Sequence, residues 1–430
     1  MTTQQKQELT DINTGLLYAK LLKQQTAKEM TSKIIVFSNG SIFTGNGDVL
    51  ENTSVIIEDG IIKKIQTGSV AAYKDARVIP ISGCMLLPGL IDCHTHIALD
   101  GGNDPFAASM GEPLAVKVLK AAKNAEKTLL SGTTTIRDMG GADGVDLEIR
   151  NAINSGLIRG PRILASGRVI CITGGHGWPI GREADGPDEV VKAVREQVKS
   201  GADLIKFMVT GGAMTPGSSP GAIQMTEDEL KSGIEAAHNA GKKTAAHAKG
   251  SEGILAALLA GIDSIEHGTV LTEEIVSLMV QKKVPVVFTL SALHNMERIG
   301  IKGGMPPEIL EKALLYKPRR QESIVMAQKA GVISAMGTDS GTPFNKHGEN
   351  PRELVRLVEA GYSPTQALMA ATSIGAKTLG LETQIGTIEE GKRADIIIVK
   401  SDPVKNITIF NDNQSIKLIM KDGNIMFTVF

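Results

Sequence analysis

The stretch Leu87-Pro88-Gly89-Leu90-Ile91-Asp92-Cys93-His94-Thr95-His96 decides the fold. It is an apolar run that a Pro-Gly pair interrupts and that ends in two histidines one residue apart. Side chains alternate between faces along a β-strand, so His94 and His96 point the same way. Two imidazoles on one face at the end of a strand can bind a metal ion from one side. A lone His-x-His pattern is weak evidence, because two ordinary polar residues at a strand end would explain it equally well.

Short β-type runs alternate with helical patterns from about residue 86 to 388. This alternation predicts parallel strands joined by helices, for example Glu189–Lys199, Glu227–Ala240 and Glu308–Ala330. Eight such units in this length match an α/β fold of the (β/α)₈ barrel type. A doubly wound open sheet is the alternative, but no Gly-x-Gly-x-x-Gly follows the first strand. The predicted strands are Leu86–Ile97, Thr133–Met139, Arg162–Ser166, Leu204–Val209, Thr244–Ala248, Ser264–Gly268, Val286–Leu290 and Ile333–Asp339.

Both ends of the chain have a different pattern from the middle. Short β-type runs there are separated by turn signals such as Asn39-Gly40, Asp59-Gly60 and Asp422-Gly423, which predicts antiparallel pairing. The first residues are polar, with leucine and isoleucine at helical spacing. The predicted domains are an N-terminal helical arm (1–32), a small β-sandwich built from both ends (33–86 and 389–430) and a catalytic barrel between them (87–388).

Composition narrows the classes of function. The 430 residues carry 46 Lys and Arg against 47 Asp and Glu, so no basic surface for nucleic acid or for a membrane is expected. No apolar run approaches the roughly 18–20 residues of a membrane span. The first thirty residues lack the apolar segment of a secretory signal. Three cysteines without a CxxC motif favour a reducing compartment. We therefore expect a cytoplasmic protein that acts on a small molecule.

Functional residues of a barrel lie at the carboxyl ends of its strands. Lys206 is the most informative, because apolar residues flank it on both sides and burial would lower the pKa of its amine. A neutral amine can react with carbon dioxide to form an anionic carbamate, whose two oxygens can bridge two cations. A strand lysine that extends outward to solvent is the alternative. The predicted strand ends carry His94, His96, Lys206, His247, His267 and Asp339.

This ordered set resembles the amidohydrolase superfamily of binuclear metal hydrolases, from about residue 33 to 430. The resemblance implies two divalent metal ions. His94 and His96 would bind the first together with Asp339, and His247 and His267 would bind the second. Lys206, N-carboxylated by carbon dioxide, would bridge the two ions. Zinc suits the site best, with manganese, cobalt and iron as alternatives.

A narrower likeness connects the chain to the Xaa-Pro dipeptidases, the ochratoxin amidases and the sequences labelled imidazolonepropionase-related. The motifs that carry it are Ile172-Thr173-Gly174-Gly175-His176-Gly177, Gly201-Ala202-Asp203-Leu204-Ile205-Lys206, Thr210-Gly211-Gly212 and Ser264-Ile265-Glu266-His267-Gly268. The likeness implies hydrolysis of a dipeptide or N-acyl amino acid by a metal-bridging hydroxide, with Asp339 as the catalytic group that transfers the proton. It also implies a homo-oligomer.

Other functions are compatible with part of this pattern. The same metal pair could attack a lactone or a phosphotriester. A mononuclear deaminase would leave Lys206 unexplained. A non-catalytic assembly protein would be expected to have lost metal ligands, and all six positions are present here.

Substrate contacts are predicted at two residues. His176 lies in a Gly-rich loop that can reach over a barrel mouth. Lys249 follows His247 by two residues and could bind a substrate carboxylate, where dipeptidases of this group often have an aromatic residue. That departure puts Xaa-Pro specificity in doubt. His294 and His347 are predicted to lie at the rim rather than to bind metal.

Overall fold

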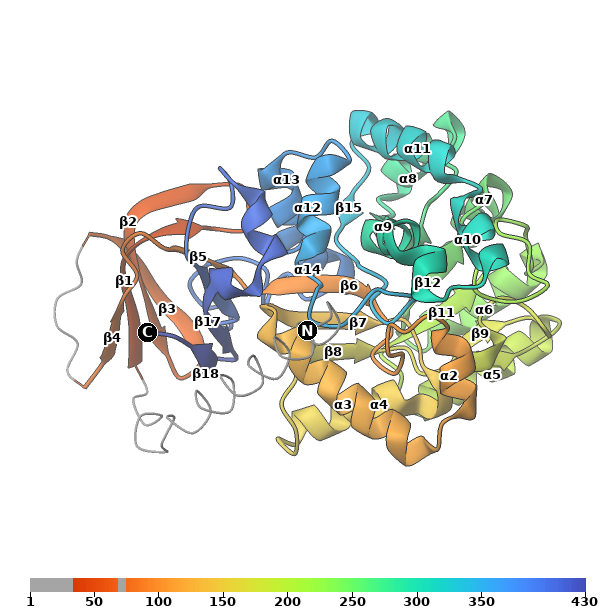
Figure 1. Ribbon diagram of the computed structural model, residues 1–430, viewed down its shortest axis with the longest axis horizontal. Coiled ribbons are helices and arrows are strands. Elements are labelled where there is room, and N and C mark those ends of the chain that lie inside the picture. The colour runs from red at the N-terminus through yellow and green to blue at the C-terminus, as the bar shows by residue number, and fades with distance from the viewer. Residues whose placement is uncertain (1–33, 69–74) are drawn as a thin grey trace.

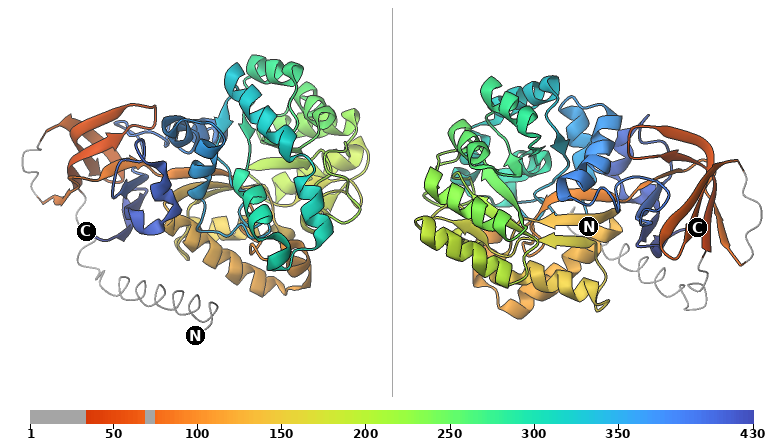
Figure 2. Two further views of the ribbon diagram at one scale, coloured as in Figure 1. Left: turned by 45° about the horizontal axis from the view of Figure 1, so that its top comes forward. Right: turned by 180° about the vertical axis from the view of Figure 1, so that it is seen from behind.

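The computed structural model describes residues 34–68 and 75–430, and the predicted arm at residues 1–32 lies outside them. The described chain is an α/β structure with one sheet built from both chain ends and two parallel sheets. Figure 1 shows the early (red) and late (blue) strands together at one end of the molecule, and both views in Figure 2 agree. Helices surround the parallel strands in the rest of the molecule.

The terminal sheet has eight strands in the order β18-β17-β16-β5-β1-β2-β3, with β4 beside β1. The prediction of antiparallel pairing was wrong in part, because β1 pairs in parallel with β4 and with β5. Antiparallel pairing of β5 with β16 joins the two chain ends. The two-layer sandwich and the domain boundaries stay predictions. The strands are β1 (Ile34–Phe43), β2 (Val49–Glu58), β3 (Ile61–Thr67), β4 (Arg77–Pro80), β5 (Met85–Pro88), β16 (Ile396–Val399), β17 (Ile416–Lys421) and β18 (Asn424–Thr428).

Two of the predicted turn signals form tight hairpins. Asp59-Gly60 joins β2 to β3 and Asp422-Gly423 joins β17 to β18, and all four residues have positive φ, as a type I′ turn requires. Asn39-Gly40 is not a turn, which corrects the prediction. It lies inside β1, where the register with β2 shifts and Asn39 has φ 58°. A Cβ at Gly40 would come within 2.5 Å of Ile81, so the bulge needs glycine there.

The eight predicted strands of the middle region are present, and the pairs in both sheets are parallel. One sheet has the order β6-β7-β8, and the other has the order β10-β9-β11-β12-β13-β14-β15. β9 and β10 were not predicted. The strands are β6 (Leu90–Thr95), β7 (Thr133–Asp138), β8 (Arg162–Ala165), β9 (Val169–Cys171), β10 (Gly181–Glu183), β11 (Leu204–Met208), β12 (Lys243–Ala248), β13 (Ser264–His267), β14 (Val286–Val287) and β15 (Ser334–Ala335).

The first predicted strand, Leu86–Ile97, is divided at Gly89. β5 before this point belongs to the terminal sheet, and β6 after it belongs to a parallel sheet. The Gly89 N–H donates to the Asp395 carbonyl, and a Cβ at Gly89 would come within 2.1 Å of Thr134 Oγ1. The Pro-Gly pair is therefore the junction between the two parts of the molecule.

Hydrogen bonds also connect the sheets to one another. The N–H of Cys93 in β6 donates to the carbonyl of Met336, just beyond β15, at 2.8 Å. On the other side, the N–H of Asp203 before β11 donates to the carbonyl of Ala165 in β8 at 2.8 Å. Arg162 of β8 forms ion pairs with Asp395 and Asp422, which ties the parallel strands to the terminal sheet.

The predicted helices Glu189–Lys199 and Glu227–Ala240 are confirmed as α5 and α6. Glu308–Ala330 is instead two helices, because Pro318 lies in the first turn of α11 and lacks the N–H that a continuous helix would need.

None of the described helices is long and apolar enough to cross a bilayer. The α-helices are α2 (Pro105–Gly111), α3 (Leu114–Leu130), α4 (Val145–Asn154), α5 (Pro187–Lys199), α6 (Glu227–Asn239), α7 (Ser251–Ala260), α8 (Glu273–Lys282), α9 (Leu290–Ile299), α10 (Pro307–Leu314), α11 (Lys317–Ala330), α12 (Arg352–Glu359), α13 (Pro364–Ala370) and α14 (Ser373–Leu379). Short 3₁₀ turns are η1 (Ala142–Gly144), η2 (Trp178–Ile180), η3 (Gly300–Gly303), η4 (Ile407–Asn411) and η5 (Asn413–Ser415).

Candidate metal centre

The predicted strand-end residues all line one cavity of about 930 Å³. The parallel register explains this, since β13 pairs with β12 so that His267 lies opposite Ala248, directly after His247. The cavity therefore collects side chains from four different strands and from the segments that follow them. The residues are His94 of β6, His96 just beyond β6, Lys206 of β11, His247 of β12, His267 of β13 and Asp339 beyond β15.

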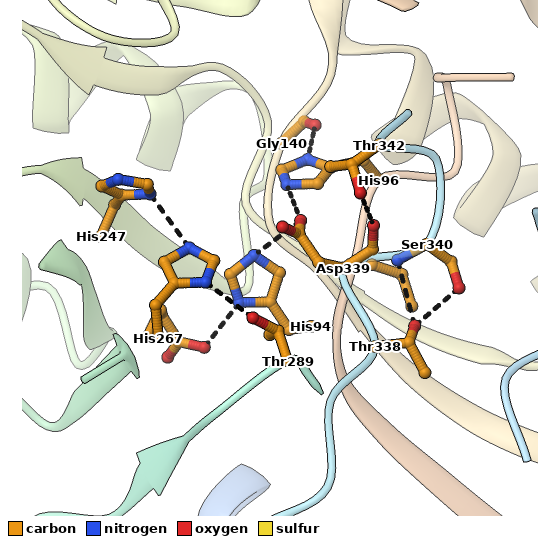
Figure 3. Close-up of polar contacts among 12 residues, drawn as sticks. His94, His96, Gly140, His247, His267, Thr289, Thr338, Asp339, Ser340 and Thr342 are labelled. Atoms are coloured by element: carbon orange, nitrogen blue, oxygen red, sulfur yellow. Dashed lines mark hydrogen bonds and ion pairs between the residues drawn. The ribbon is translucent and has the colours of Figure 1, made fainter. Parts of the chain in front are cut away.

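His94, His96 and Asp339 form the tightest group (Figure 3). Asp339 Oδ1 lies 3.4 Å from His94 Nε2 and 3.3 Å from His96 Nε2. The Nδ1 atoms are engaged elsewhere: that of His96 donates to the Gly140 carbonyl at 2.8 Å, and that of His94 lies 2.8 Å from the Glu266 carboxylate. A neutral ring that donates through Nδ1 keeps a lone pair on Nε2. Both rings therefore direct Nε2 at the Asp339 carboxylate, to which His96 is hydrogen-bonded.

The charge states in this group suit metal binding. Burial lowers the pKa of His94 to about 4, and the Lys206 charge acts in the same direction. Burial opposes ionisation of Asp339, but electrostatic interactions with His94, His96 and Lys206 and a hydrogen bond with His96 outweigh it and hold the pKa of this carboxyl well below its ordinary range. At neutral pH the group thus offers a neutral imidazole at His94 and a carboxylate at Asp339, which are the forms that bind metal ions.

His247 and His267 form a second group beside the first. His267 Nε2 and His247 Nδ1 lie 3.0 Å apart, and the His267 ring centroid is 5.0 Å from that of His94. His267 Nδ1 is 2.8 Å from the Thr289 hydroxyl. His247 Nε2 is buried and has no hydrogen-bond partner within the described chain. Burial lowers the pKa of both rings well below the ordinary value, so both are neutral.

Lys206 is 1% exposed, which excludes the alternative of a lysine extended to solvent. Burial lowers the pKa of its amine to about 8, although the Glu266 charge opposes the shift. It forms no ion pair with the residues in the described ranges. A buried amine without a carboxylate partner, in a cavity with five imidazoles, is an unusual arrangement that a modified or ligated lysine would explain.

A buried ion pair that the sequence analysis missed supports His94. Arg137 Nη2 donates to Glu266 Oε1 at 2.8 Å, and the Ser264 hydroxyl donates to the same oxygen at 2.7 Å. Glu266 Oε2 is left to accept from His94. Burial would raise the pKa of Glu266, but the Arg137 charge and the His94 hydrogen bond bring it to about 2. A glutamate inside the buried strand Ser264–His267, directly before His267, was the available signal.

The backbone at the site is strained. His267, Thr289 and Asp339 have φ of 72°, 54° and 62°, a region that non-glycine residues rarely adopt and that costs about 1–3 kcal/mol per residue. Asp92 holds the last of these turns, because its carboxylate accepts from the Thr338 hydroxyl at 2.6 Å and from the His94 N–H at 3.1 Å. The surrounding fold therefore holds the backbone of these three residues in a conformation that they would rarely adopt by themselves, as is common at functional sites.

The two predicted substrate contacts also line the cavity. The ring centroid of His176 lies 4.5 Å from that of His247, and its Nδ1 is 2.9 Å from the Thr215 hydroxyl. Burial lowers the pKa of His176 to about 3 and that of Lys249 to about 8. The roles of these residues stay predictions.

The two remaining predicted rim residues lie outside this cavity. His294 is on the solvent side of α9, as expected. His347 is not at the rim, which corrects the prediction: it is 4% exposed and its Nε2 donates toward the carbonyls of His96 and Leu99. It therefore supports the backbone behind His96.

The rest of the cavity combines apolar walls with cations. Apolar side chains come from Phe106, Met208, Met214 and Met296, among others. The lining residues include the cations Lys249, Lys312, Lys317 and Arg320, and Asp339 is the one carboxylate among the lining residues in the described chain. The Nε of Arg320 is buried without a partner within the same ranges, although its Nη2 donates to the Thr289 carbonyl at 2.7 Å.

The donor set contains one group that could hold a metal ion and a pair of imidazoles beside it. Ring nitrogens of His94 and His96 converge with a carboxylate oxygen, and these three atoms lie within 4.8 Å of one another. The 3.0 Å between His247 Nδ1 and His267 Nε2 is close to the roughly 3.3 Å that separates two nitrogens on one tetrahedral zinc ion. Imidazole and carboxylate ligands of this kind suit zinc, manganese, cobalt and iron.

Parallel strands with an ionisable cluster at their carboxyl ends place the chain among α/β enzymes. It belongs to the Amidohydrolase family, whose model matches residues 85–426, and it is a hydrolase of that superfamily. It is 30% identical over 432 residues to ochratoxinase from Aspergillus niger, covering 92% of this chain and 87% of that protein.

Comparison with solved structures gives relatives of the same kind. A Xaa-Pro dipeptidase with methionine bound in its active site matches with a TM-score of 0.85 and 34% identity, over 91% of this chain and 99% of that one. A prolidase complexed with N-methylphosphonate-L-proline matches with a TM-score of 0.86 and 28% identity, over 92% of this chain and 100% of that one.

Proposed function

We propose that this chain is a binuclear metal-dependent hydrolase that cleaves the amide bond of a dipeptide or N-acyl amino acid. The observation that carries the proposal is the convergence of four imidazoles, one carboxylate and one buried lysine in a single cavity. These residues come from strands far apart in the sequence, so local structure alone does not require them to meet.

The ligands divide into the two groups that the geometry separates. His94, His96 and Asp339 would hold one ion, and His247 and His267 would hold the other. Lys206 would bridge the ions as a carbamate, formed when its neutral amine adds to carbon dioxide and releases a proton. A lysine pKa of about 8 supports this step, because part of the amine is then neutral near physiological pH.

We also propose that the two parallel sheets are arcs of one (β/α)₈ barrel. The hydrogen bonds from β6 to the segment after β15, and from the segment before β11 to β8, support closure on both sides. A closed barrel would place every proposed ligand at its carboxyl-terminal mouth.

The chain's own residues would carry the proton and the substrate. When bound, the ions supply a hydroxide nucleophile at neutral pH and polarise the substrate carbonyl. Asp339, ionised at neutral pH, accepts the proton of the attacking water and delivers it to the leaving nitrogen. Neutral His176 donates a hydrogen bond to the substrate carbonyl oxygen as negative charge develops there.

Lys249 would bind the carboxylate of the leaving amino acid. It lines the cavity beside the imidazoles, and the cationic wall that it shares with Arg320 favours an anionic substrate. The Xaa-Pro dipeptidase with bound methionine supports a leaving group that is an amino acid. The apolar walls would accept an apolar side chain.

A lactone or phosphotriester hydrolase is the alternative, because the same metal pair could attack either substrate. A non-catalytic assembly role is not favoured, since every proposed ligand is present and faces one cavity.

Elemental analysis of protein purified without chelator tests the proposal, together with activity on dipeptides and N-acyl amino acids. We expect about two metal ions per chain. Lys206→Ala should lose metal and amide cleavage, whereas Lys249→Met, the matched control, should keep the metal. Two ions without amide cleavage would favour the lactone or phosphotriester alternative. No metal after reconstitution with bicarbonate would refute the metal centre.

A further inference from the structure

A second cavity, on the opposite side of α9, is lined by basic side chains. α9 packs against α12, and a groove of about 660 Å³ runs between them. We call it the arginine groove. Its lining residues are Ser291, His294, Asn295, Arg298, Asn345, Glu349, Arg352, Arg356 and Asn411.

Helix periodicity explains why the cations converge. His294 and Arg298 lie four residues apart on α9, and Arg352 and Arg356 lie four residues apart on α12. Residues at this spacing project from the same helix face. The facing helices thus direct three guanidinium groups and one imidazole into one groove.

Carboxylates pair with two of the three arginines, and the third, Arg298, carries the remaining positive charge. Glu349 is the one acidic residue among the lining residues of the described chain, and its Oε2 pairs with Arg352 Nη1 at 2.8 Å. Arg356 pairs with the exposed Glu359 outside the groove. Arg298 forms no ion pair with any residue in the described ranges. The nearest remaining acid on α9, Glu297, is paired with Lys317.

A hydroxyl in the wall of the groove also lacks a partner. Ser291 is 5% exposed, and its Oγ makes no hydrogen bond within the described chain, while its N–H donates to Glu353. This oxygen is closed to solvent, so a bound oxyanion would meet the positive charge of the groove and not this hydroxyl.

We propose that the arginine groove binds a phosphate-type oxyanion. Guanidinium groups match the geometry of phosphate oxygens through paired N–H donors, and three of them here come from two rigid helices. The opposite face of α9 contributes Ala292, Leu293 and Met296 to the metal-site cavity, so the two sites are distinct but share one helix.

Calorimetric titration with inorganic phosphate tests this proposal on the full-length, metal-loaded protein. Chloride at equal ionic strength serves as the reference, because general screening would affect both salts alike. We expect saturable binding in the wild type that weakens by about a hundredfold in the double variant Arg298→Gln/Arg356→Gln, since each lost charged hydrogen bond is worth about tenfold or more. Phosphate that binds at the metal ions would still bind to this variant, so the titration distinguishes that site from the arginine groove.

Two further variants test whether the loss of phosphate binding comes from the arginine groove itself. Arg319→Gln removes one cation from an exposed position on α11 outside the groove and should leave phosphate binding unchanged. Asn411→Asp adds a negative charge to the groove wall without removing an arginine and should weaken binding even if the double variant is unstable. Absence of saturable heat, or equal binding in wild type and Asn411→Asp, would overturn the proposal. The titration requires no catalytic turnover, so its outcome is independent of the proposed function.

Discussion

The buried ion pair behind His94 gives the sharpest test of how the fold prepares the metal centre. Glu266 accepts from Arg137, from Ser264 and from His94, and the side chains of the ion pair are 0% and 5% exposed. Glu266→Gln keeps the shape but removes the charge. The amide nitrogen would then face His94 Nδ1, which favours the tautomer with a proton on Nε2. That tautomer cannot bind a metal ion through Nε2.

The expected size of the effect has two parts. Breaking a buried ion pair by removing one charge costs about 3–5 kcal/mol, because the other charge stays buried without a partner. Here the remaining charge is Arg137, which keeps its hydrogen bonds to the Cys93 carbonyl and to Ser264 but faces a neutral amide oxygen in place of the carboxylate. The loss of the group that orients a metal-binding histidine lowers metal affinity by about 10–100-fold.

Two measurements separate these effects. Urea unfolding of the metal-free variant gives the loss in free energy of unfolding, and competition with a chelator gives the metal affinity. Ser264→Ala is the matched control, since it removes one hydrogen bond from the same carboxylate and should cost about 1 kcal/mol with unchanged metal affinity. The reasoning would be refuted if Glu266→Gln bound metal as tightly as the wild type, or if it were as stable without metal.

Three further predictions follow from single contacts. Lys249→Met should raise KM about 10–100-fold for substrates with a free carboxylate and leave KM unchanged for their amides, as steady-state kinetics would show. Gly337→Ala would place a Cβ 2.3 Å from Val287 Cγ1, so we expect about 1–3 kcal/mol of destabilisation in urea unfolding, with reduced metal content. Burial raises the pKa of Glu353 from 4.5 to about 7. The folded state therefore binds more protons than the unfolded state between these values, and its stability should fall by roughly 3 kcal/mol as pH rises through this window. Glu353→Gln should remove this contribution from unfolding curves recorded at pH 4.5 and pH 8, whereas the contributions of Asp92 and Asp146, whose pKa values burial also raises, should stay.

The sequence predicted the parts of the structure that local pattern determines. The parallel strands and the Asp59-Gly60 and Asp422-Gly423 turns follow from alternation and from residues that tolerate positive φ. The gathering of His94, His247 and Asp339 could be predicted because parallel strands bring their carboxyl ends to one edge.

What the sequence left open depends on contacts between distant segments. Arg137 and Glu266 lie on different strands, and nothing in either strand alone says that they pair. Thr289 has a left-handed backbone, which the sequence does not indicate because the residue is neither glycine nor asparagine. The bulge at Asn39-Gly40 lies within the β1–β2 pairing and next to Ile81, contacts that the two residue types do not reveal.

The pairing of β5 with β16 also has a consequence for how the protein is made. Pro88 lies beside Ile396 in that pair, although about 300 residues separate them in the chain. On a ribosome, β5 emerges long before β16 exists, and the edge of β5 that pairs with β16 stays open until β16 has been synthesised. Closing so long a loop is slow and leaves the edge exposed to aggregation. Because β5 leads directly into the strand that carries His94, we expect the position of His94 to become fixed only after β16 has paired with β5.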